Sequence, residues 1–132
     1  MISIDRAAAK GALKQVFDQG RERLSAGYWV VIFPEGTRVA PGETARYKPG
    51  GAHLAVRSGA RVVPVAHNAG EFWRKDRFTI APGLITVSIG PPIDPAGKTA
   101  AKINTLAAAW IETEMRRLSP HLYPAAADAV PA

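Results

Sequence analysis

The residues best suited to chemistry are six consecutive ones, Phe33 to Arg38, with the sequence FPEGTR. Arg38 can bind a phosphate through two parallel hydrogen bonds, and Gly36 lets the backbone approach a ligand closely. Glu35 can accept a hydrogen bond from a ligand hydroxyl or hold Arg38 in place. The segment is therefore a candidate anion-binding site. The alternative is a β-turn with a surface Glu–Arg ion pair, which would add little to stability.

The distribution of charge also favours an anionic partner. The formal net charge is +6, and residues 1–78 hold 13 Lys and Arg against 7 Asp and Glu, whereas residues 79–132 hold 4 against 4. A phosphorylated ligand, an anionic bilayer surface or nucleic acid would fit this excess. Nucleic-acid binding is not expected, because no recognised helix-turn-helix, finger or aromatic stacking pattern accompanies the charge.

Length and composition indicate one ordinary globular domain. The chain has 132 residues, of which 47% are hydrophobic and 21% charged. It contains no cysteine, which excludes a disulfide framework and thiolate metal sites. No run of about 18 apolar residues is present, so the sequence as written is not expected to cross a membrane. Contact with a membrane would be peripheral, or made by segments outside this sequence.

The elements expected around FPEGTR alternate between helix and strand. Apolar spacing predicts a helix over residues 5–24, and the continuous apolar run at 28–33 predicts a strand buried on both faces. A short helix over 52–57 and a second buried strand over 61–67 follow. This order implies a parallel pair with a right-handed crossover. Ligands of such sheets bind after the carboxyl ends of the strands, which here means residues 34–38 and 67–71.

The remaining sequence predicts two short strands, a long helix and a tail. Residues 78–80 and 84–89 are expected to be strands joined by a turn, and residues 98–118 repeat apolar residues at the spacing of an amphipathic helix. Residues 119–132 are expected to form a loose C-terminal tail. The predicted fold class is α/β, with a mostly parallel sheet flanked by helices.

Beyond its physical chemistry, FPEGTR resembles the third sequence block of the glycerophosphate and lysophosphatidate acyltransferase family. Ile4-Asp5-Arg6 resembles the end of the second block, in which an arginine helps to bind the substrate phosphate. Val63-Pro64-Val65 resembles the fourth block, an apolar strand beside the acyl site. RYKPGGAHLA, at 46–55, resembles the basic segment after the third block, and VPVAHNAGEFW resembles the bacterial lysophosphatidate branch. The resemblance extends from Ile4 to about Tyr123.

The resemblance implies a reaction and a set of site residues. The hydroxyl of lysophosphatidate would attack an acyl thioester, making phosphatidate and releasing coenzyme A or acyl carrier protein, with no metal or cofactor. Another lysolipid or an ornithine-type lipid stays open as the acceptor. The acyl side would be lined by Val63, Pro64 and Val65. The substrate phosphate would be neutralised or positioned by Arg6, Glu35, Gly36, Thr37, Arg38 and Lys48.

One block of the family pattern is absent from the sequence. Family members carry an H-x-x-x-x-D block, whose histidine is the general base and whose aspartate orients it. The three histidines are His53, His67 and His121. The residues five positions after them are Ser58, Phe72 and Ala126. No catalytic dyad is therefore present.

Because the sequence begins inside the second block, the resemblance implies a partial acyltransferase domain over residues 1–118. The first strand, the histidine segment and any anchoring helices are expected to lie outside it. Alone, the chain is expected to be inactive. The complete protein is expected at the cytoplasmic face of the inner membrane, in peripheral contact with its anionic surface or anchored by those segments. The alternative is a non-catalytic module that binds lipid phosphates.

The histidines have structural alternatives to a role in the site. His53 lies in an apolar predicted helix and is expected to be a packed or capping residue. His67 ends a predicted strand at the ligand edge, where it is expected to be a hydrogen-bonded loop residue or, less favourably, a site residue. Together with Glu71 it suggests a metal pair, but no third ligand is in view, so no metal site is predicted.

The three tryptophans differ in their expected surroundings. Trp29 is expected in the core. Trp73 is the best candidate for contact with a membrane interface, because indole has an apolar body and a polar edge, although a solvated basic loop is the alternative. Its neighbours are Phe72, Arg74, Lys75 and Arg77.

Overall fold

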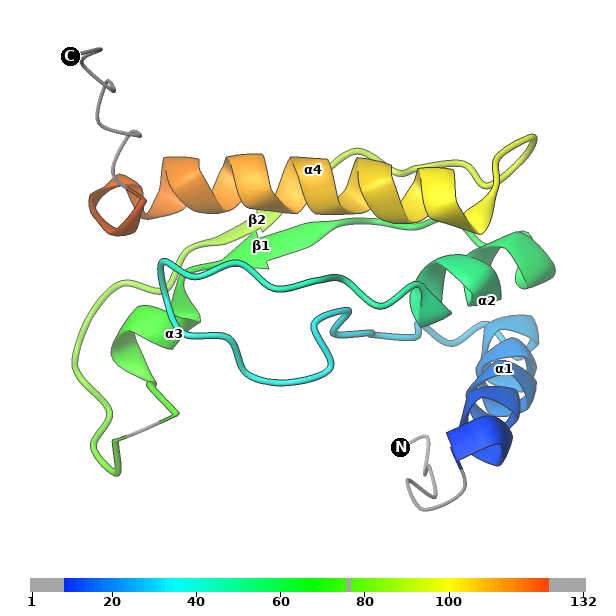
Figure 1. Cartoon of the computed structure of the whole chain (residues 1–132), viewed down its shortest axis with the longest axis horizontal. Helices are drawn as coiled ribbons and strands as arrows, with labels where there is room; N and C mark the ends of the chain where they lie inside the picture. Colours follow the sequence, from blue (N-terminus) through cyan, green and yellow to red (C-terminus); the bar gives the residue numbers. More distant parts are fainter. Residues whose placement is uncertain (1–8, 76, 124–132) are drawn as a thin grey trace, which may run out of the picture.

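The computed structural model describes residues 9–75 and 77–123. Figure 1 shows its elements in chain order: α1 (Ala9–Ser25), α2 (Gly50–Ser58), β1 (Val65–His67), α3 (Ala69–Phe72), β2 (Val87–Ile89), α4 (Ala100–Leu118) and the 3₁₀ helix η1 (Pro120–Leu122). In these two ranges, no helix is long and apolar enough to cross a bilayer.

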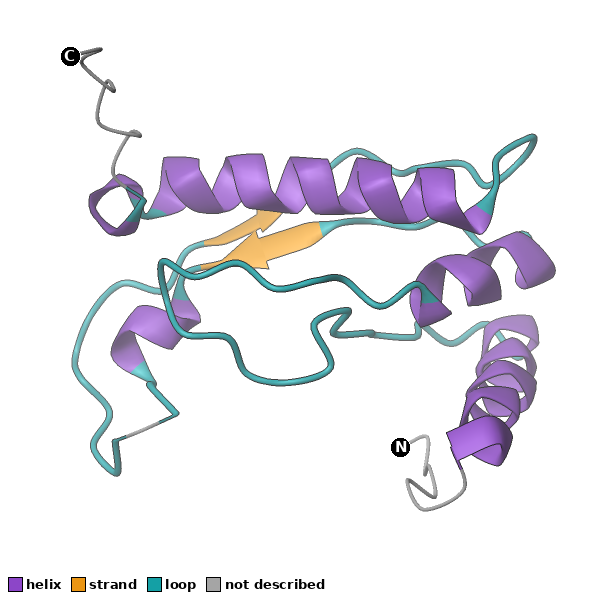
Figure 2. Ribbon diagram, viewed as in Figure 1, coloured by secondary structure: helices purple, strands orange, loops and turns teal. Residues whose placement is uncertain are grey.

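The strands β1 and β2 form an antiparallel pair. Val65 faces Ile89, and His67 faces Val87. An antiparallel bridge between Val62 and Ile93 continues the pairing beyond the strands. Helix α4 runs along one face of the pair (Figure 2). Gly90 makes this close approach possible, because a Cβ added to it would come within 2.6 Å of the indole of Trp110.

The core is small and joins α2 to α4. Ala52, Ala100 and Ile103 are buried together, and Val62 and Ile93 pack against them. Helix α1 joins this core through Gly20, where an added Cβ would lie 2.7 Å from the side chain of Leu54. The core therefore joins α2 and α4 to the Val62–Ile93 bridge, and α1 packs against α2 beside it.

The helix predictions are confirmed within the described residues. The predicted helices 5–24, 52–57 and 98–118 correspond to α1, α2 and α4, although residues 5–8 lie outside the described part. Thr99 caps the start of α4, where its hydroxyl accepts a hydrogen bond from the backbone N–H of Lys102. Gly59 ends α2 in the left-handed conformation, with φ of 72°. Helix α3 was not predicted.

The predicted parallel pair is wrong for the described residues. Residues 28–33 are not part of a sheet, and all of them except Val30 are exposed, with Trp29 at 86%, Val31 at 78% and Phe33 at 70%. The prediction that Trp29 lies in the core is wrong for the same reason. A continuous apolar run favours a strand that is buried on both faces. Such a strand forms only where neighbouring strands can pair with it. Within residues 9–75 and 77–123, no strand pairs with residues 28–33.

The other strand predictions are confirmed only in part. The strand predicted over 61–67 is shortened to β1, because Pro64 has no N–H to donate; its carbonyl accepts a hydrogen bond from Gly90 instead. The strand predicted over 84–89 is shortened to β2. Residues 78–80 form no strand and lie instead in an exposed loop.

Residues 119–123 are held against the body of the protein, so this part of the predicted tail is not loose. Ser119 is fully buried and donates a hydrogen bond to Glu71 of α3. His121 Nε2 lies 2.9 Å from the other carboxylate oxygen of Glu71. Gly42 also packs against Leu122. The rest of the predicted tail, residues 124–132, lies outside the described residues.

Candidate functional site

The FPEGTR segment forms a turn that depends on its glycine. The backbone N–H of Gly36 donates to the carbonyl of Phe33 at 3.1 Å, and Gly36 has φ of 67°. This left-handed conformation costs other residues about 1 to 2 kcal/mol. The expected alternative, an ion pair between Glu35 and Arg38, is not formed in this turn.

The structure brings Lys48 to this turn. The backbone N–H of Lys48 donates to the carbonyl of Pro34 at 2.8 Å, which ties the two segments together. The Lys48 side chain then passes across Gly36, where an added Cβ would lie 2.7 Å from Nζ. A cation is thus held against the backbone of the turn, and the absence of a side chain at residue 36 leaves the space for it.

Tyr47 fixes the segment that carries Lys48. Its hydroxyl donates to Glu112 Oε1 of α4 at 3.1 Å, and its carbonyl accepts from Asn104 Nδ2 of the same helix at 3.2 Å. Helix α4 therefore holds Tyr47 at both ends. Because Tyr47 is buried and bonded to α4, the backbone of the adjacent Lys48 is held in place.

The surroundings of Tyr47 favour its neutral form. Burial raises the pKa of Tyr47 far above its ordinary value of 10.0, and the nearby carboxylates of Glu112 and Glu35 raise this pKa further. The second oxygen of Glu112 is buried without a hydrogen bond, although Arg116 lies 3.9 Å away.

The remaining predicted site residues occupy different surroundings. Thr37 and Arg38 are exposed after the turn. Pro64 is buried and Val65 begins β1, where its side chain is 43% exposed. Arg6 lies outside the described residues. The structure thus brings Lys48 against Gly36, which follows Glu35 in the turn, and leaves Thr37 and Arg38 exposed after it. Val63 and Pro64 precede β1, and Val65 begins it.

The histidines make contacts with neighbouring residues of the protein. The ring of His53 lies edge-on to Phe17 at 6.4 Å between centroids, and His67 Nδ1 accepts a hydrogen bond from the N–H of Ala69 at 3.3 Å. Glu71 faces Ser119 and His121. In the part of the chain that the structure describes, no group of three or more metal-ligating side chains is present.

No sequence pattern indicated the roles of Tyr47, Asn104 and Glu112. Tyr47 belongs to the basic segment after FPEGTR, but Glu112 follows 65 residues later and no spacing rule links them. An alignment of periodic positions on α4 would at most mark Glu112 as a polar residue on an amphipathic helix. Tyr47 and Glu112 come into contact only because of how α4 packs over the strand pair.

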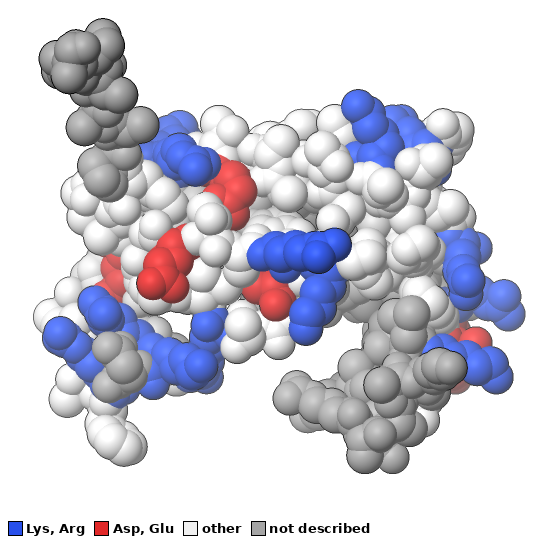
Figure 3. Space-filling model, viewed as in Figure 1, with Lys and Arg blue, Asp and Glu red and all other residues white. Residues whose placement is uncertain are grey.

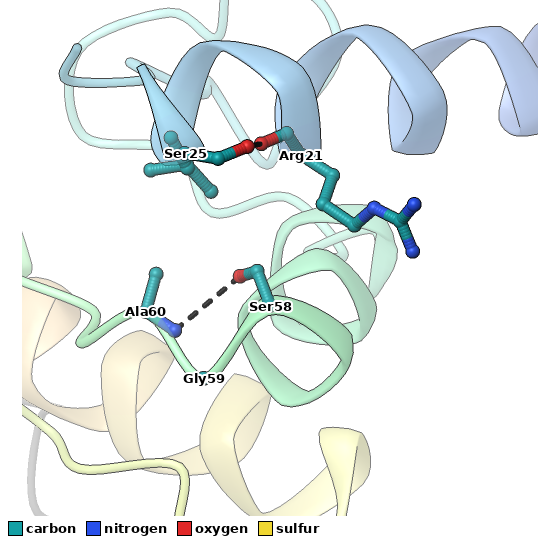
Figure 4. Close-up of a pocket in the computed structure, with 6 residues that line it drawn as sticks. Arg21, Ser25, Ser58, Gly59 and Ala60 are labelled. Carbon is teal, nitrogen blue, oxygen red and sulfur yellow. Dashed lines mark hydrogen bonds between the residues drawn. The ribbon is translucent and has the colours of Figure 1, made fainter. Parts of the chain in front are cut away.

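A separate hollow lies between the C-terminal ends of α1 and α2 (Figure 4). Its volume is about 270 Å³. The hydroxyl of Ser25 donates to the carbonyl of Arg21 at 2.6 Å, and the hydroxyl of Ser58 accepts from the N–H of Ala60 at 3.3 Å. These groups complete the helix ends, and the residues that line the hollow do not include any of the FPEGTR turn.

The sequence of the chain is similar to that of a known protein family. The sequence model of the Acyltransferase family matches residues 1–68. The chain is 45% identical over 122 residues to the 1-acyl-sn-glycerol-3-phosphate acyltransferase of Pseudomonas aeruginosa, covering 90% of this chain and 48% of that protein. It is 34% identical over 104 residues to the enzyme of the same name from Limnanthes alba, covering 78% of this chain and 37% of that protein.

A solved structure shares the fold. The crystal structure of the 1-acyl-sn-glycerophosphate (LPA) acyltransferase PlsC from Thermotoga maritima matches with a TM-score of 0.70 at 25% sequence identity. The match covers 82% of this chain and 44% of the other. The chain thus spans about half or less of the length of these relatives, and the described residues have a partial α/β acyltransferase fold. By the family match and the shared fold, the chain belongs to the acyltransferase family.

Proposed function

We propose that the chain forms the substrate-phosphate part of an enzyme that transfers an acyl group from a thioester to lysophosphatidate, making phosphatidate. The observation that carries the proposal is the placement of Lys48 across Gly36 within the FPEGTR turn. The names of the relatives, 1-acyl-sn-glycerol-3-phosphate acyltransferases, supply the acceptor and the reaction.

In this proposal, cations neutralise the phosphate and the turn positions the glycerol. Lys48 acts as a point charge beside the backbone of Gly36, while Arg38 forms two parallel hydrogen bonds to phosphate oxygens. Arg6 adds a third cation, as the family motif implies. Glu35 and Thr37 bind glycerol oxygens. Val63 to Val65 line the acyl side.

The chemical step needs a group that takes the proton from the acceptor hydroxyl. The hydroxyl oxygen then forms a bond to the thioester carbonyl carbon, and the thiolate of coenzyme A or acyl carrier protein leaves. General-base catalysis contributes about 10² to 10⁴-fold, and positioning contributes more. Because this sequence has no H-x-x-x-x-D block, we expect it to bind the acceptor without turnover. The thioester is a co-substrate, and no metal or cofactor takes part.

The proposed location follows from the substrate. A lysophospholipid resides in a bilayer, and the excess of basic residues favours an anionic surface. We therefore place the complete protein at the cytoplasmic face of the inner membrane, bound peripherally or through segments outside this chain.

Binding and turnover can be tested separately. A short-chain, water-soluble lysophosphatidate should bind this chain in titration calorimetry, and both Lys48→Ala and Arg38→Ala should weaken binding about tenfold or more, as expected for lost charge-assisted hydrogen bonds. Lys102→Ala is the matched control, since Lys102 is an exposed lysine of α4 that is not among the proposed site residues. Equal affinity in all three variants would overturn the assignment of the site.

Acyl transfer is measured with this chain and with a version extended to include an H-x-x-x-x-D block. Activity in the extended version alone supports the proposal. A second candidate, a non-catalytic lipid-phosphate binding module, is favoured by the absence of the dyad from this sequence. Phosphate binding with no transfer in either version, across lysolipid acceptors and both types of thioester, would establish that second candidate.

A further inference from the structure

A loop that projects from the end of α3 has the features of a membrane contact. The N–H of Ala81 donates to the carbonyl of Phe72 at 2.9 Å and closes the loop at its base. Asn68 strengthens the base, because its amide oxygen accepts from the N–H of Thr86 at 2.7 Å. Residues 73–80 are here named the aromatic loop, and its described residues, 73–75 and 77–80, extend beyond this base at the lower left of Figure 1. Residue 76 lies outside the described residues.

The aromatic loop exposes large apolar side chains. Phe78 is fully exposed, Ile80 is 65% exposed and Trp73 is 60% exposed. Scattered single apolar residues are ordinary on protein surfaces, but three within eight residues of a projecting loop form a patch that calls for a partner. The hydrogen bonds at the base join the two ends of the loop, and no strand is present among its described residues.

Basic side chains alternate with these apolar ones. The aromatic loop contains Arg74, Lys75 and Arg77 against one acidic residue, Asp76, and all three basic side chains are exposed. Figure 3 shows Lys and Arg gathered at the lower left, over α3 and the loop that follows it. Glu71, the acidic residue of α3, contacts Ser119 and His121.

We propose that the aromatic loop inserts Trp73, Phe78 and Ile80 into the headgroup layer of an anionic bilayer, while its basic side chains bind lipid phosphates. Aromatic rings are favoured at this depth, and cations bind the negative surface beside them. The inference rests on the proposed function, because an acceptor lysophospholipid would be taken from the same bilayer.

A bilayer fits the aromatic loop better than a protein does. A stable protein interface buries about 800 Å² on each partner and usually seats its anchors in pockets. A loop of eight residues that projects with its apolar side chains outward offers little such area. A bilayer requires no matching pocket. An acidic protein such as an acyl carrier protein is therefore the alternative to be tested.

Vesicle binding by the full chain tests the proposal. Flotation is measured with vesicles of phosphatidylcholine alone and of phosphatidylcholine with phosphatidylglycerol. The chain should bind the anionic vesicles more tightly, and both F78S/I80S and K75E/R77E should weaken that binding about tenfold or more. Val31→Ser and Lys102→Glu are matched controls, because each changes an exposed residue outside the aromatic loop.

A fluorescent label locates the contact. The chain has no cysteine, so Thr79→Cys allows a single environment-sensitive dye to be attached in the aromatic loop, with Thr44→Cys as the control position. The dye at 79 should shift to the blue on anionic vesicles, and the dye at 44 should not. Vesicle binding with no shift at 79, unchanged binding by both double variants, or binding to acyl carrier protein in place of vesicles would overturn the proposal.

The aromatic loop and the phosphate site can be judged independently. The double variants should keep the affinity of the chain for short-chain lysophosphatidate in solution, because no bilayer is involved. If the native chain binds vesicles through the aromatic loop but no lysophosphatidate, the proposed function fails and the membrane contact stands. If the native chain binds lysophosphatidate but no vesicles, the membrane contact fails and the proposed function stands.

Discussion

The hydroxyl of Tyr47 donates a hydrogen bond of 3.1 Å to Glu112 of α4, and this bond links the longest helix to the candidate phosphate site. The residue after Tyr47 is Lys48, whose side chain crosses Gly36. Asn104, two turns earlier on α4, holds the carbonyl of Tyr47. The position of the cation in the site therefore depends on a helix that provides no proposed substrate contact.

Removal of the Tyr47 hydroxyl should reduce stability and disturb the site. Tyr47→Phe leaves Glu112 Oε1 without its partner in a carboxylate whose other oxygen is already buried without a hydrogen bond. We expect the free energy of unfolding to fall by about 1 to 3 kcal/mol. Urea denaturation measures it. Tyr28→Phe is the control, because Tyr28 is 61% exposed. Equal losses in the two variants would contradict the link to α4.

The raised pKa of Tyr47 predicts a specific loss of stability in alkaline solution. The pKa in the folded protein lies above 10.0, its ordinary value, because burial and the carboxylates disfavour the phenolate. The unfolded chain therefore loses this proton first as the pH rises. The contribution of Tyr47 to stability is complete below this ordinary value and falls above it, by up to about 1.4 kcal/mol per pH unit.

The measurement is urea denaturation of the native chain and Tyr47→Phe from about pH 9 to about pH 11. Lysines titrate equally in both proteins, so the difference between them isolates Tyr47. The native chain should lose stability more steeply than the variant over this range. Parallel curves would show that Tyr47 is not protected from ionisation.

Gly36 should be essential for the cation site and dispensable for the fold. In Gly36→Ala the new Cβ would meet Lys48 Nζ at 2.7 Å and force this side chain away. Gly27→Ala is the matched control, because Gly27 has a similar positive φ of 82° with nothing within 4 Å of an added Cβ. Both variants should lose about 1 to 2 kcal/mol from backbone strain.

Only Gly36→Ala should also weaken the binding of short-chain lysophosphatidate, by about tenfold, as measured by calorimetry. The comparison separates the strain of the backbone from the displacement of Lys48. Equal affinities in the two variants would mean that the crossing of Gly36 by Lys48 has no part in binding.

The sequence predicted those parts of the fold that depend on local signals. Helix α4 follows from its apolar spacing and the capping hydroxyl of Thr99, and the end of α2 follows from Gly59. The prediction of a strand at 28–33 was wrong, because a strand needs partner strands and no local sequence pattern ensures that they are present. For the site, the family resemblance named both Gly36 and Lys48, and the structure shows these two residues close together.

Other features could not be predicted because they join distant residues. The bond from Tyr47 to Glu112 spans 65 residues, and the contact of Glu71 with Ser119 spans 48. Each depends on how α4 lies over the strand pair, which is a property of packing. The aromatic loop was visible as a pattern around Trp73, but its closed base was not, since the hydrogen bond from Ala81 to Phe72 has no sequence signature.

Gly90 should be required for the packing of α4 over the strands. Its Cα faces the indole of Trp110, and an added Cβ would lie 2.6 Å from a ring atom. Gly90→Ala therefore overfills the contact and should cost about 1 to 3 kcal/mol in urea denaturation. Gly70→Ala is the control, because its nearest neighbour, Pro41, would be at an ordinary 3.4 Å. A stable Gly90→Ala would show that Trp110 is free to move aside.

Glu71 should hold the segment after α4 to the body of the protein. One of its oxygens accepts from the buried Ser119, and the other lies 2.9 Å from His121 Nε2. Glu71→Ala leaves the hydroxyl of Ser119 buried without an acceptor, so we expect a loss of about 1 to 3 kcal/mol. Glu71→Gln should lose less, because its amide oxygen can still accept from Ser119.

The test combines urea denaturation with limited proteolysis, since a released segment is cleaved more readily. Glu43→Ala is the matched control, because Glu43 is an exposed glutamate outside this contact. Faster cleavage between α4 and the C-terminus in Glu71→Ala, but not in Glu43→Ala, is the expected result. If Glu71→Ala is as stable and as resistant as the control, residues 119–123 are held mainly by other packing, such as that between Leu122 and Gly42.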